Sequence, residues 1–319
     1  MKHFPELSDL MKLEEYKSSL VRYNTLGSIT HGKYEYPIES IVIGSEDKTR
    51  PTLGLFGGVH GLERVGSQII LSFLKSLFFQ MTWDKDLCHK LEKYRIVCIP
   101  IVNPGGMARS TRSNLNDVDL MRNAPVEADQ EHVFPLISGH RLSPKLPWFR
   151  GTGNLEKESE ILINFVKEEM FPSEASIALD IHSGFGVRDQ IWYPYARTKK
   201  DFPLLPEAMK LKALLDQTFP HHIYKFEAQS LNYLTHGDLW DYIFDAHFDD
   251  PEVKDSVFLP LTLELGSWSW IRKNPAQFFT KLGLFHPIKQ HRHSRIMRRH
   301  ILLLDFLGRA VRNHESWAV

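Results

Sequence analysis

The sequence predicts a single α/β domain in which helices flank a central β-sheet. Apolar runs of strand length alternate along the chain with segments whose apolar residues recur at helical spacing, and that alternation is typical of an α/β domain. The 319 residues contain no fixed-period repeat, low-complexity tract or linker that would divide them. Hydrophobic residues make up 42% and charged residues 24% of the chain, as in globular proteins.

The first half of the chain begins with a predicted helix. Over residues 7–21 the apolar side chains fall roughly on one helical face. Residues 38–43 and 53–59 are β-branched or apolar runs bounded by Gly and Pro, so they predict sheet strands. Helical spacing resumes over residues 61–79, and residues 95–101 predict another buried strand.

The second half continues the alternation after a long loop. The same signals predict, in order, a helix over 155–170, a strand over 175–181, a helix over 206–219, a strand over 257–265 and a helix over 292–311. We therefore expect one domain over residues 1–319, with an N-terminal helical extension over 1–30 and a C-terminal helix over 290–319. Residues 103–154 are rich in Gly, Pro, Asn and Ser, and so long a loop is expected to line the functional site.

The charge balance gives no sign of a polyanionic partner. The chain has 39 Lys and Arg against 39 Asp and Glu, so no global field favours nucleic acid or an anionic membrane, and neither partner is expected. A basic run near the C-terminus is interleaved with apolar helix positions and predicts a solvated helix face; its members are Arg292, Arg295, Arg298 and Arg299.

Compartment is inferred from three features. The longest apolar run, residues 69–79, is interrupted by polar residues and is too short to span a bilayer. The first residues lack a basic region followed by an apolar stretch, so no signal peptide is expected. The two cysteines, Cys88 and Cys98, form no Cys-x-x-Cys pair, which excludes a thiolate metal cluster and fits a reducing compartment. These features favour the cytoplasm.

Two residues at the turn from a buried strand into a helix are good zinc ligands. His60 and Glu63 are three apart, so their side chains can converge on one side of that turn. Catalytic zinc sites commonly use two His and one Glu and leave a fourth position for water. Among the 16 histidines, His182 is the best third ligand because it ends a separate apolar strand, and α/β sheets build their sites outside the carboxyl ends of strands.

A zinc hydrolase also needs a proton acceptor and a cation for the developing oxyanion. Glu264 fits the first role because it lies within an apolar strand, where an ionised carboxylate is costly unless it is paired or near a metal. Arg109, Arg112 and Arg122 in the long loop are candidates for the electrophile and the substrate clamp, since guanidinium binds carboxylate through two parallel hydrogen bonds.

Over about residues 53–266 these motifs resemble the zinc metallocarboxypeptidase family of the carboxypeptidase A type. Residues 57–63 (Gly-Gly-Val-His-Gly-Leu-Glu) look like its first ligand pair, residues 180–183 (Asp-Ile-His-Ser) its third ligand, and residues 262–265 (Thr-Leu-Glu-Leu) its general-base strand, while Asn103-Pro104 looks like the turn between them. The resemblance implies a central mixed, twisted sheet flanked by helices on both faces. It further implies one zinc per chain, held by His60, Glu63 and His182, with Glu264 activating the water.

The resemblance assigns roles in the loop as well. Asp119 matches the carboxylate that orients the first histidine, a role that is also physically expected. Arg109 and Arg112 both fit the position of the arginine that polarises the scissile carbonyl. A later Asn-Arg pair binds the terminal carboxylate of the substrate in this family, and here Arg122, followed by Asn123, keeps the arginine. Met121 stands where the asparagine of that pair belongs.

Two further residues are matched by position. Tyr233 lies eight residues before Asp241-Tyr242, as the mobile tyrosine of the family precedes an Asp-aromatic step. Trp240 is then expected to form the floor of the specificity pocket.

These residues together predict a zinc-dependent hydrolase that cleaves an amide bond in a peptide or an acylated amino acid. Aspartoacylase and succinylglutamate desuccinylase relatives are the alternative, because they share the His-x-x-Glu segment and an Asn-Pro turn followed by a Thr-Arg step, here Thr111-Arg112. The general-base strand and the long stretch from His60 to His182 favour the peptidase branch. A non-catalytic binding protein is the alternative of another class, but such a protein is expected to have lost a ligand or the base.

Overall fold

The computed structural model describes residues 4–129, 133–253, 255–280 and 282–318. Its centre is one eight-stranded sheet with the strand order β1-β2-β4-β3-β5-β8-β6-β7. The strands are β1 (Val21–His31), β2 (Tyr34–Gly44), β3 (Thr52–Gly57), β4 (Arg95–Ile99), β5 (Ala175–Phe185), β6 (Gln190–Tyr193), β7 (Lys225–Ala228) and β8 (Val257–Gly266). The inner strands β4, β3, β5 and β8 run parallel, while β1, β2 and the β6–β8 pairing are antiparallel, so the sheet is mixed.

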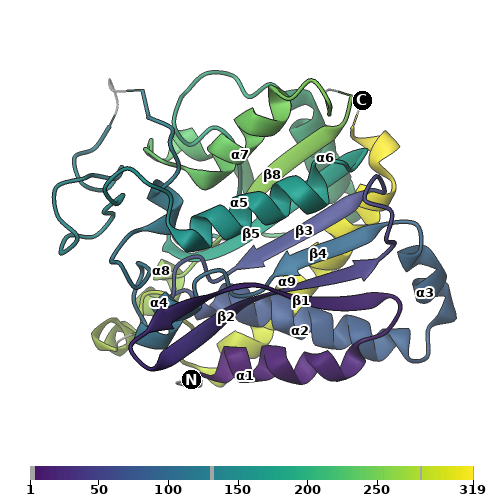
Figure 1. Cartoon of the computed structure of the whole chain (residues 1–319), viewed down its shortest axis with the longest axis horizontal. Helices are drawn as coiled ribbons and strands as arrows, with labels where there is room; N and C mark the ends of the chain where they lie inside the picture. The colour runs from purple at the N-terminus through teal and green to yellow at the C-terminus, as the bar shows by residue number, and fades with distance from the viewer. Residues whose placement is uncertain (1–3, 130–132, 254, 281, 319) are drawn as a thin grey trace.

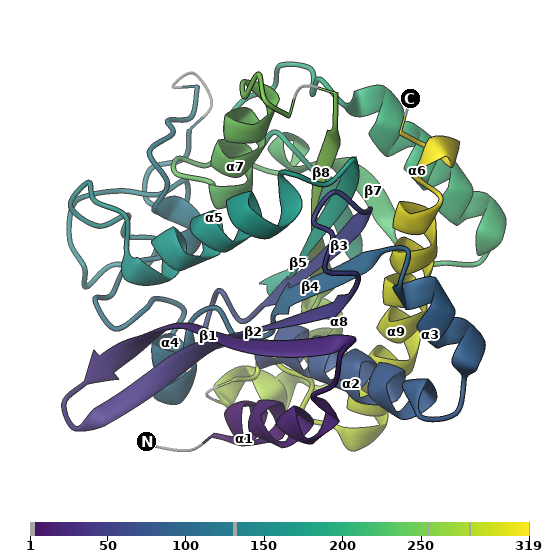
Figure 2. The same ribbon diagram turned by 45° about the vertical axis from the view of Figure 1, so that its right-hand side comes forward.

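Helices cover both faces of this sheet (Figures 1 and 2). They are α1 (Pro5–Lys12), α2 (Arg64–Met81), α3 (Lys85–Leu91), α4 (Pro104–Arg109), α5 (Lys157–Met170), α6 (Leu205–Thr218), α7 (Leu239–Phe248), α8 (Trp268–Lys273) and α9 (Gln290–Arg312). The long helices α2 and α9 pack on each other and on β3 and β5. Helices α5 and α7 contact each other and cover the opposite face of the sheet. The predicted α/β domain with a mixed sheet between two helical layers is confirmed. Of the described helices, none is long and apolar enough to cross a membrane.

The inner strands are buried along nearly their whole length because helices cover both of their faces. Every residue of β3 and β4 is buried, as is every residue of β8 after Val257. Parallel strands of this kind read as continuous apolar runs rather than as alternating ones, which is why the sequence located them within a few residues. The carboxyl ends of β3, β5 and β8 meet at one edge, where the functional side chains lie.

The N-terminal region differs from the expected helical extension over residues 1–30. Helix α1 ends at Lys12, a short 3-10 helix follows to Tyr16, and residues 21–31 form the edge strand β1. Ser18 and Ser19 follow the short helix, and serine hydroxyls compete with helical backbone hydrogen bonds. Beyond them the chain pairs with β2, in register Val21 to Ile43, and this tertiary pairing decides the conformation.

One buried histidine gives the fold a pH dependence that can be measured. His247 of α7 packs against the rings of Phe171 and Phe258, at centroid distances of 4.9 and 5.4 Å, and its Nε2–H donates to Ser256 Oγ (3.0 Å). Burial lowers the pKa of His247 to about 4. Its pKa in the unfolded chain is about 6.5, so the unfolded state binds the proton more readily.

The neutral imidazole therefore stabilises the fold fully above about pH 6.5, and this contribution is lost as the pH falls toward 4. Lowering the pH from 7.5 to 5.5 should reduce the free energy of unfolding of the unsubstituted protein, measured in urea. We expect this reduction to be about 1 kcal/mol smaller in His247→Gln. Replacing the exposed His89 by Gln is the matched control and should leave the pH dependence unchanged. An unaltered pH dependence in His247→Gln would contradict the assignment.

Candidate metal centre

The first two predicted ligands are fixed by a tight turn between β3 and α2. A Cβ on Gly61 would meet the backbone carbon of Gly106 at 2.0 Å, so only glycine allows the β3–α2 turn to pack against α4. Asn103 ties the same two segments together, because its Nδ2 donates to Val59 O (3.1 Å) while its Oδ1 caps α4 at Gly106 N (2.7 Å). His60 lies in this turn and Glu63 directly precedes α2.

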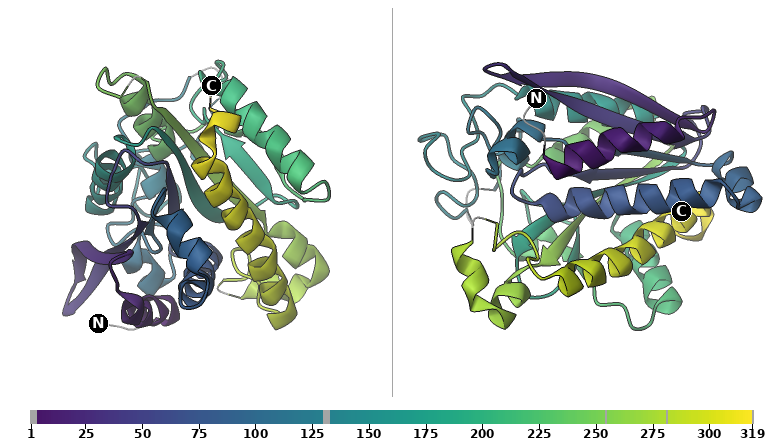
Figure 3. Two further views of the ribbon diagram at one scale, coloured as in Figure 1. Left: turned by 90° about the vertical axis from the view of Figure 1, so that its right-hand side faces the viewer. Right: turned by 90° about the horizontal axis from the view of Figure 1, so that it is seen from below.

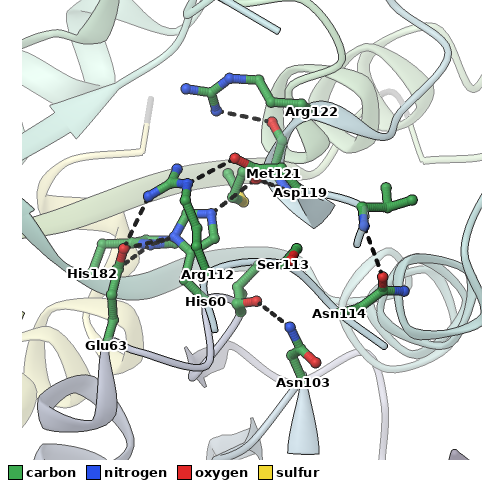
Figure 4. A network of polar contacts seen from close by, with 12 residues as sticks. His60, Glu63, Asn103, Arg112, Ser113, Asn114, Asp119, Met121, Arg122 and His182 are labelled. Carbon is green, nitrogen blue, oxygen red and sulfur yellow. Dashed lines mark hydrogen bonds and ion pairs between the residues drawn. The ribbon is translucent and has the colours of Figure 1, made fainter. Parts of the chain in front are cut away.

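The third predicted ligand reaches the same point from the neighbouring strand. His182 lies on β5, and its Nδ1 is 3.2 Å from His60 Nδ1 and 2.9 Å from Glu63 Oε2 (Figure 4). His60 Nδ1 is 2.8 Å from Glu63 Oε1. All three residues are buried, and three of their ligand atoms lie within 4.8 Å of one another. The structure thus brings the predicted triad together.

The outer nitrogen of each imidazole faces a carboxylate. His60 Nε2 donates to Asp119 Oδ1 (3.0 Å), and His182 Nε2 donates to Asp180 Oδ2 (2.7 Å). An ionised carboxylate can only accept, so each imidazole carries its proton on Nε2 and turns a lone pair on Nδ1 inward. Asp119 thereby has the position expected of the carboxylate that orients the first histidine.

The inward-facing atoms fit a divalent cation. Two Nδ1 lone pairs and a carboxylate are all acceptors, so at these separations they repel one another unless a positive charge lies between them. Where no cation is bound, the same surroundings draw a proton onto His182 instead, because Asp180 and Glu63 outweigh burial and raise the pKa of His182 well above its usual range. Burial likewise opposes ionisation of Glu63, yet the two imidazoles hold the pKa of this carboxyl below its usual range. Two nitrogens and one carboxylate form the donor set of catalytic zinc sites.

Glu264 lies on β8 directly across from His182 of β5. Its Oε1 accepts a hydrogen bond from Phe185 N (2.9 Å), and its side chain lines the same cavity as the triad. Burial, and then the charge of Glu63, raise the pKa of Glu264 to about 8. A carboxyl in this environment can take up and release a proton near neutral pH.

A cavity of about 640 Å³ opens onto the metal centre. The His60, Glu63 and His182 side chains and Glu264 line it together with Arg112, Arg122 and Tyr233. Much of the remaining wall is aromatic. Phe134 and Trp148 come from the long loop, Phe185 and Trp192 from β5 and β6, and Trp268 and Phe285 from the chain after β8. The prediction that the long loop lines the site is confirmed.

The structure separates the two arginines that the sequence left open. Arg112 lines the cavity, where its Nε donates to Asp119 Oδ2 (2.8 Å) and its guanidinium nitrogen lies 3.3 Å from Glu63 Oε1. Arg109 does not line it; its guanidinium pairs with Asp117 Oδ1 (3.1 Å) on the surface of the loop. The helix α4 ends at Arg109, and the backbone turns at Ser110, which has a positive φ of 54°, so the two side chains diverge.

Arg122 lies in the cavity wall without a carboxylate partner. The residue is 3% exposed, its guanidinium donates to Met121 O (3.2 Å), and its Nε has no hydrogen-bond partner. Within the described part of the chain, no carboxylate forms an ion pair with it. Tyr233 shares this wall, with its ring centroid 5.9 Å from the guanidinium carbon. Burial raises the pKa of Tyr233, although Arg122 opposes the shift.

Two predicted substrate contacts lie elsewhere. Asn123 does not line the cavity, because its Nδ2 donates to Arg150 O and Asn154 O within the long loop and its Oδ1 accepts from Glu156 N at the start of α5. Trp240 is buried behind His182 rather than at the cavity surface, and its Nε1 donates to Asp180 Oδ2 (2.9 Å). The expected pocket floor is therefore a support for the carboxylate that holds His182.

Asp180 is a site residue that sequence reasoning missed. It receives hydrogen bonds from both His182 and Trp240 and lies buried in β5. The signal was present in the sequence, because residues two apart on a strand point to the same face and a metal-binding histidine generally donates its outer N–H to a carboxylate.

Comparisons with known proteins agree with this geometry. A model of the zinc carboxypeptidase family matches residues 7–250, a range that includes all three triad residues and leaves Glu264 outside. Human carboxypeptidase D is 27% identical over 135 residues, which cover 39% of this chain and 10% of that protein. Carboxypeptidase SOL1 of Arabidopsis thaliana is 23% identical over 255 residues, which cover 79% of this chain and 47% of that protein. The chain thus spans about a tenth of one relative and about half of the other.

Solved structures show the same fold. The thrombin-activatable fibrinolysis inhibitor superposes with a TM-score of 0.70 at 19% identity, covering 98% of this chain and 73% of that one. Carboxypeptidase A of Helicoverpa armigera gives a TM-score of 0.69 at 18% identity, covering 99% and 74%. Because the family model matches most of its length, this chain belongs to the zinc carboxypeptidase family.

Proposed function

We propose that this protein is a zinc-dependent carboxypeptidase that hydrolyses the last amide bond of a peptide. The observation that carries the proposal is Arg122, a buried guanidinium without a carboxylate in ion-pair range among the described residues, in the wall of the cavity that holds the metal centre. A buried cation is costly unless an anion joins it. The terminal carboxylate of a peptide is an anion that guanidinium binds through two parallel hydrogen bonds.

Each of the side chains in the cavity has a separate role in the proposed reaction. His60, Glu63 and His182 would hold the zinc ion, which would supply a Lewis acid to polarise the carbonyl and lower the pKa of water. Glu264 takes the proton from the attacking water and returns it to the leaving amine. Arg112 reaches the same cavity and stabilises the charge that develops on the carbonyl oxygen. The aromatic wall keeps water out, which strengthens each of these electrostatic contacts.

Deacylation of an N-acyl amino acid is the alternative of the same chemical class. The family match does not favour it, and neither does it favour a binding protein without turnover. Met121 lines the cavity beside Arg122, so the carboxylate clamp has one guanidinium and a thioether where a second donor would otherwise lie. We therefore assign the recognition of the terminal carboxylate to Arg122.

Replacing Glu264 by Gln tests the proton acceptor. The amide keeps the size of the carboxyl but cannot take up a proton, so kcat should fall by about 10²- to 10⁴-fold. Zinc content should stay the same, because Glu264 is not one of the three ligands. Turnover of a peptide with a free C-terminus measures the first quantity and elemental analysis the second. Undiminished turnover in Glu264→Gln would exclude this residue as the base.

Replacing Arg122 by Gln tests the carboxylate clamp. Loss of a hydrogen bond between charged groups costs about 1.5–3 kcal/mol, so kcat/KM for a peptide with a free C-terminus should fall about 10- to 150-fold. The same peptide with an amidated C-terminus should be a poor substrate of both proteins, so its kcat/KM should change little. Arg109→Gln is the matched control and should resemble the unsubstituted enzyme. Equal discrimination between the two peptides before and after the Arg122 change would contradict the proposed role.

A further inference from the structure

The balanced net charge of the chain conceals a strongly uneven distribution. Residues 265–304 contain eight Lys and Arg and four His but no Asp or Glu. All 39 Asp and Glu and the other 31 Lys and Arg lie outside this segment. The segment comprises the end of β8, α8, the following 3-10 turn and the first two thirds of α9. It is a local positive region in a protein that is neutral overall.

The same segment exposes large apolar side chains. Phe278 and Phe279, in the 3-10 helix Pro275–Phe279, are 56% and 88% exposed, and their rings pack edge to face with centroids 5.6 Å apart. Trp268 and Ile288 are nearly half exposed. Seen from below, α8 and this turn lie beside the N-terminal end of α9 (Figure 3, right). The contact is direct, because a guanidinium nitrogen of Arg292 donates to Trp270 O (2.9 Å).

Exposed basic side chains lie on α8, just before α9 and on α9 itself. Arg272, Lys273 and Lys289 are exposed, and the solvent face of α9 continues with His291, Arg295 and Arg298 at spacings of four and three residues. Among the described Lys and Arg of the segment, Arg299 is the one with a carboxylate in ion-pair range, Asp189 Oδ2 at 3.6 Å. We define the basic aromatic face as Trp268, Arg272, Lys273, Phe278, Phe279, Ile288, Lys289, Arg295 and Arg298.

This face borders the mouth of the cavity. Trp268 lines the cavity, and its Nε1 donates to Gly184 O (2.9 Å). Phe285, from the same segment, also lines it and accepts a hydrogen bond at its carbonyl from Ser183 Oγ (2.8 Å). Whatever binds the basic aromatic face is therefore held next to the cavity.

We propose that the basic aromatic face binds the surface of an anionic lipid membrane. Phenylalanine and tryptophan side chains gain free energy by entering the boundary between headgroups and acyl chains, and Lys and Arg are attracted to anionic headgroups. Both phenylalanine side chains are more than half exposed, so their rings can enter the acyl-chain boundary, and this apolar contribution favours a bilayer over a nucleic-acid strand. The proposal concerns where the protein binds and stands independently of the peptidase activity.

The test is binding of the full-length protein to vesicles, measured by co-sedimentation. We expect vesicles of phosphatidylcholine with 30% phosphatidylserine to bind at least about tenfold more tightly than pure phosphatidylcholine, and 0.5 M salt to weaken this binding. The double variant Phe278→Ser/Phe279→Ser should lose about tenfold in affinity for the anionic vesicles. Arg295→Gln/Arg298→Gln should lose a similar factor at 0.1 M salt.

Matched variants elsewhere distinguish a specific face from a general effect. Phe79 and Trp83 are comparably exposed aromatic residues at the far end of α2, and Lys85 and Lys93 are exposed basic residues. Their replacement by Ser and Gln, respectively, should leave vesicle binding unchanged. Thermal unfolding of each variant verifies that it is folded.

Three results would overturn the proposal. The first is a failure of the unsubstituted protein to prefer anionic vesicles. The second is an equal loss of binding in the control variants. The third is that the unsubstituted protein binds a DNA oligonucleotide tightly and that Phe278→Ser/Phe279→Ser weakens neither DNA binding nor vesicle binding. This result would identify a polyanion site that does not use the aromatic residues.

Discussion

The structure depends on one electrostatic constraint: the buried carboxyl groups around the two histidines of the metal centre need cations to balance their negative charge. Four carboxyl groups, those of Glu63, Asp119, Asp180 and Glu264, lie less than a tenth exposed around the two facing imidazoles. Arg112 and Arg122 are the guanidinium groups in the same cavity wall. Carboxylates in a water-poor interior are stable only when cations accompany them, and a divalent ion between two Nδ1 atoms and Glu63 supplies the charge that the arginines do not. Folding and metal binding are therefore expected to be coupled.

The sheet provides the rigidity that this cluster requires. His60, His182 and Glu264 come from or directly follow three neighbouring parallel strands, and the register of β5 with β8 sets His182 opposite Glu264. A shift of one residue in that register would turn one of the two side chains to the other face of the sheet. The buried apolar strands therefore fix the distance between the metal ligand and the proton acceptor, while the long loop contributes Arg112, Asp119 and Arg122.

The buried strands and the long loop differ in how far the sequence predicts them. A continuous apolar run predicts a buried strand, and the residues at the carboxyl ends of neighbouring strands are expected to lie close together. The sequence therefore predicted the triad and Glu264 as one group. Asp180 could have been predicted in the same way, because it precedes His182 by two residues on β5 and so points to the same face of the sheet. The edge strand β1 could not, because its conformation depends on pairing with β2 rather than on a local pattern.

Loop and helix residues were harder to place because no periodicity gives the direction of their side chains. Asn123 adjoins Arg122 in sequence, and Trp240 follows Tyr233 by seven residues. Their side chains nevertheless support the loop and Asp180 instead of facing the cavity. Arg109 and Arg112 are three residues apart, and the positive φ at Ser110 turns the backbone between them, so that Arg112 lines the cavity and Arg109 lies on the surface of the loop. Average charge likewise concealed the basic aromatic face, because an overall balance of 39 against 39 says nothing about its distribution.

The most direct test of the metal centre is the zinc content of the protein, measured by inductively coupled plasma mass spectrometry after purification without a His-tag or added metal. We predict about one zinc per chain, its loss in His60→Ala, and its retention in His291→Ala, a change in an exposed histidine of α9. Protein that holds no metal and takes up none when zinc is added would contradict the account of the buried cluster.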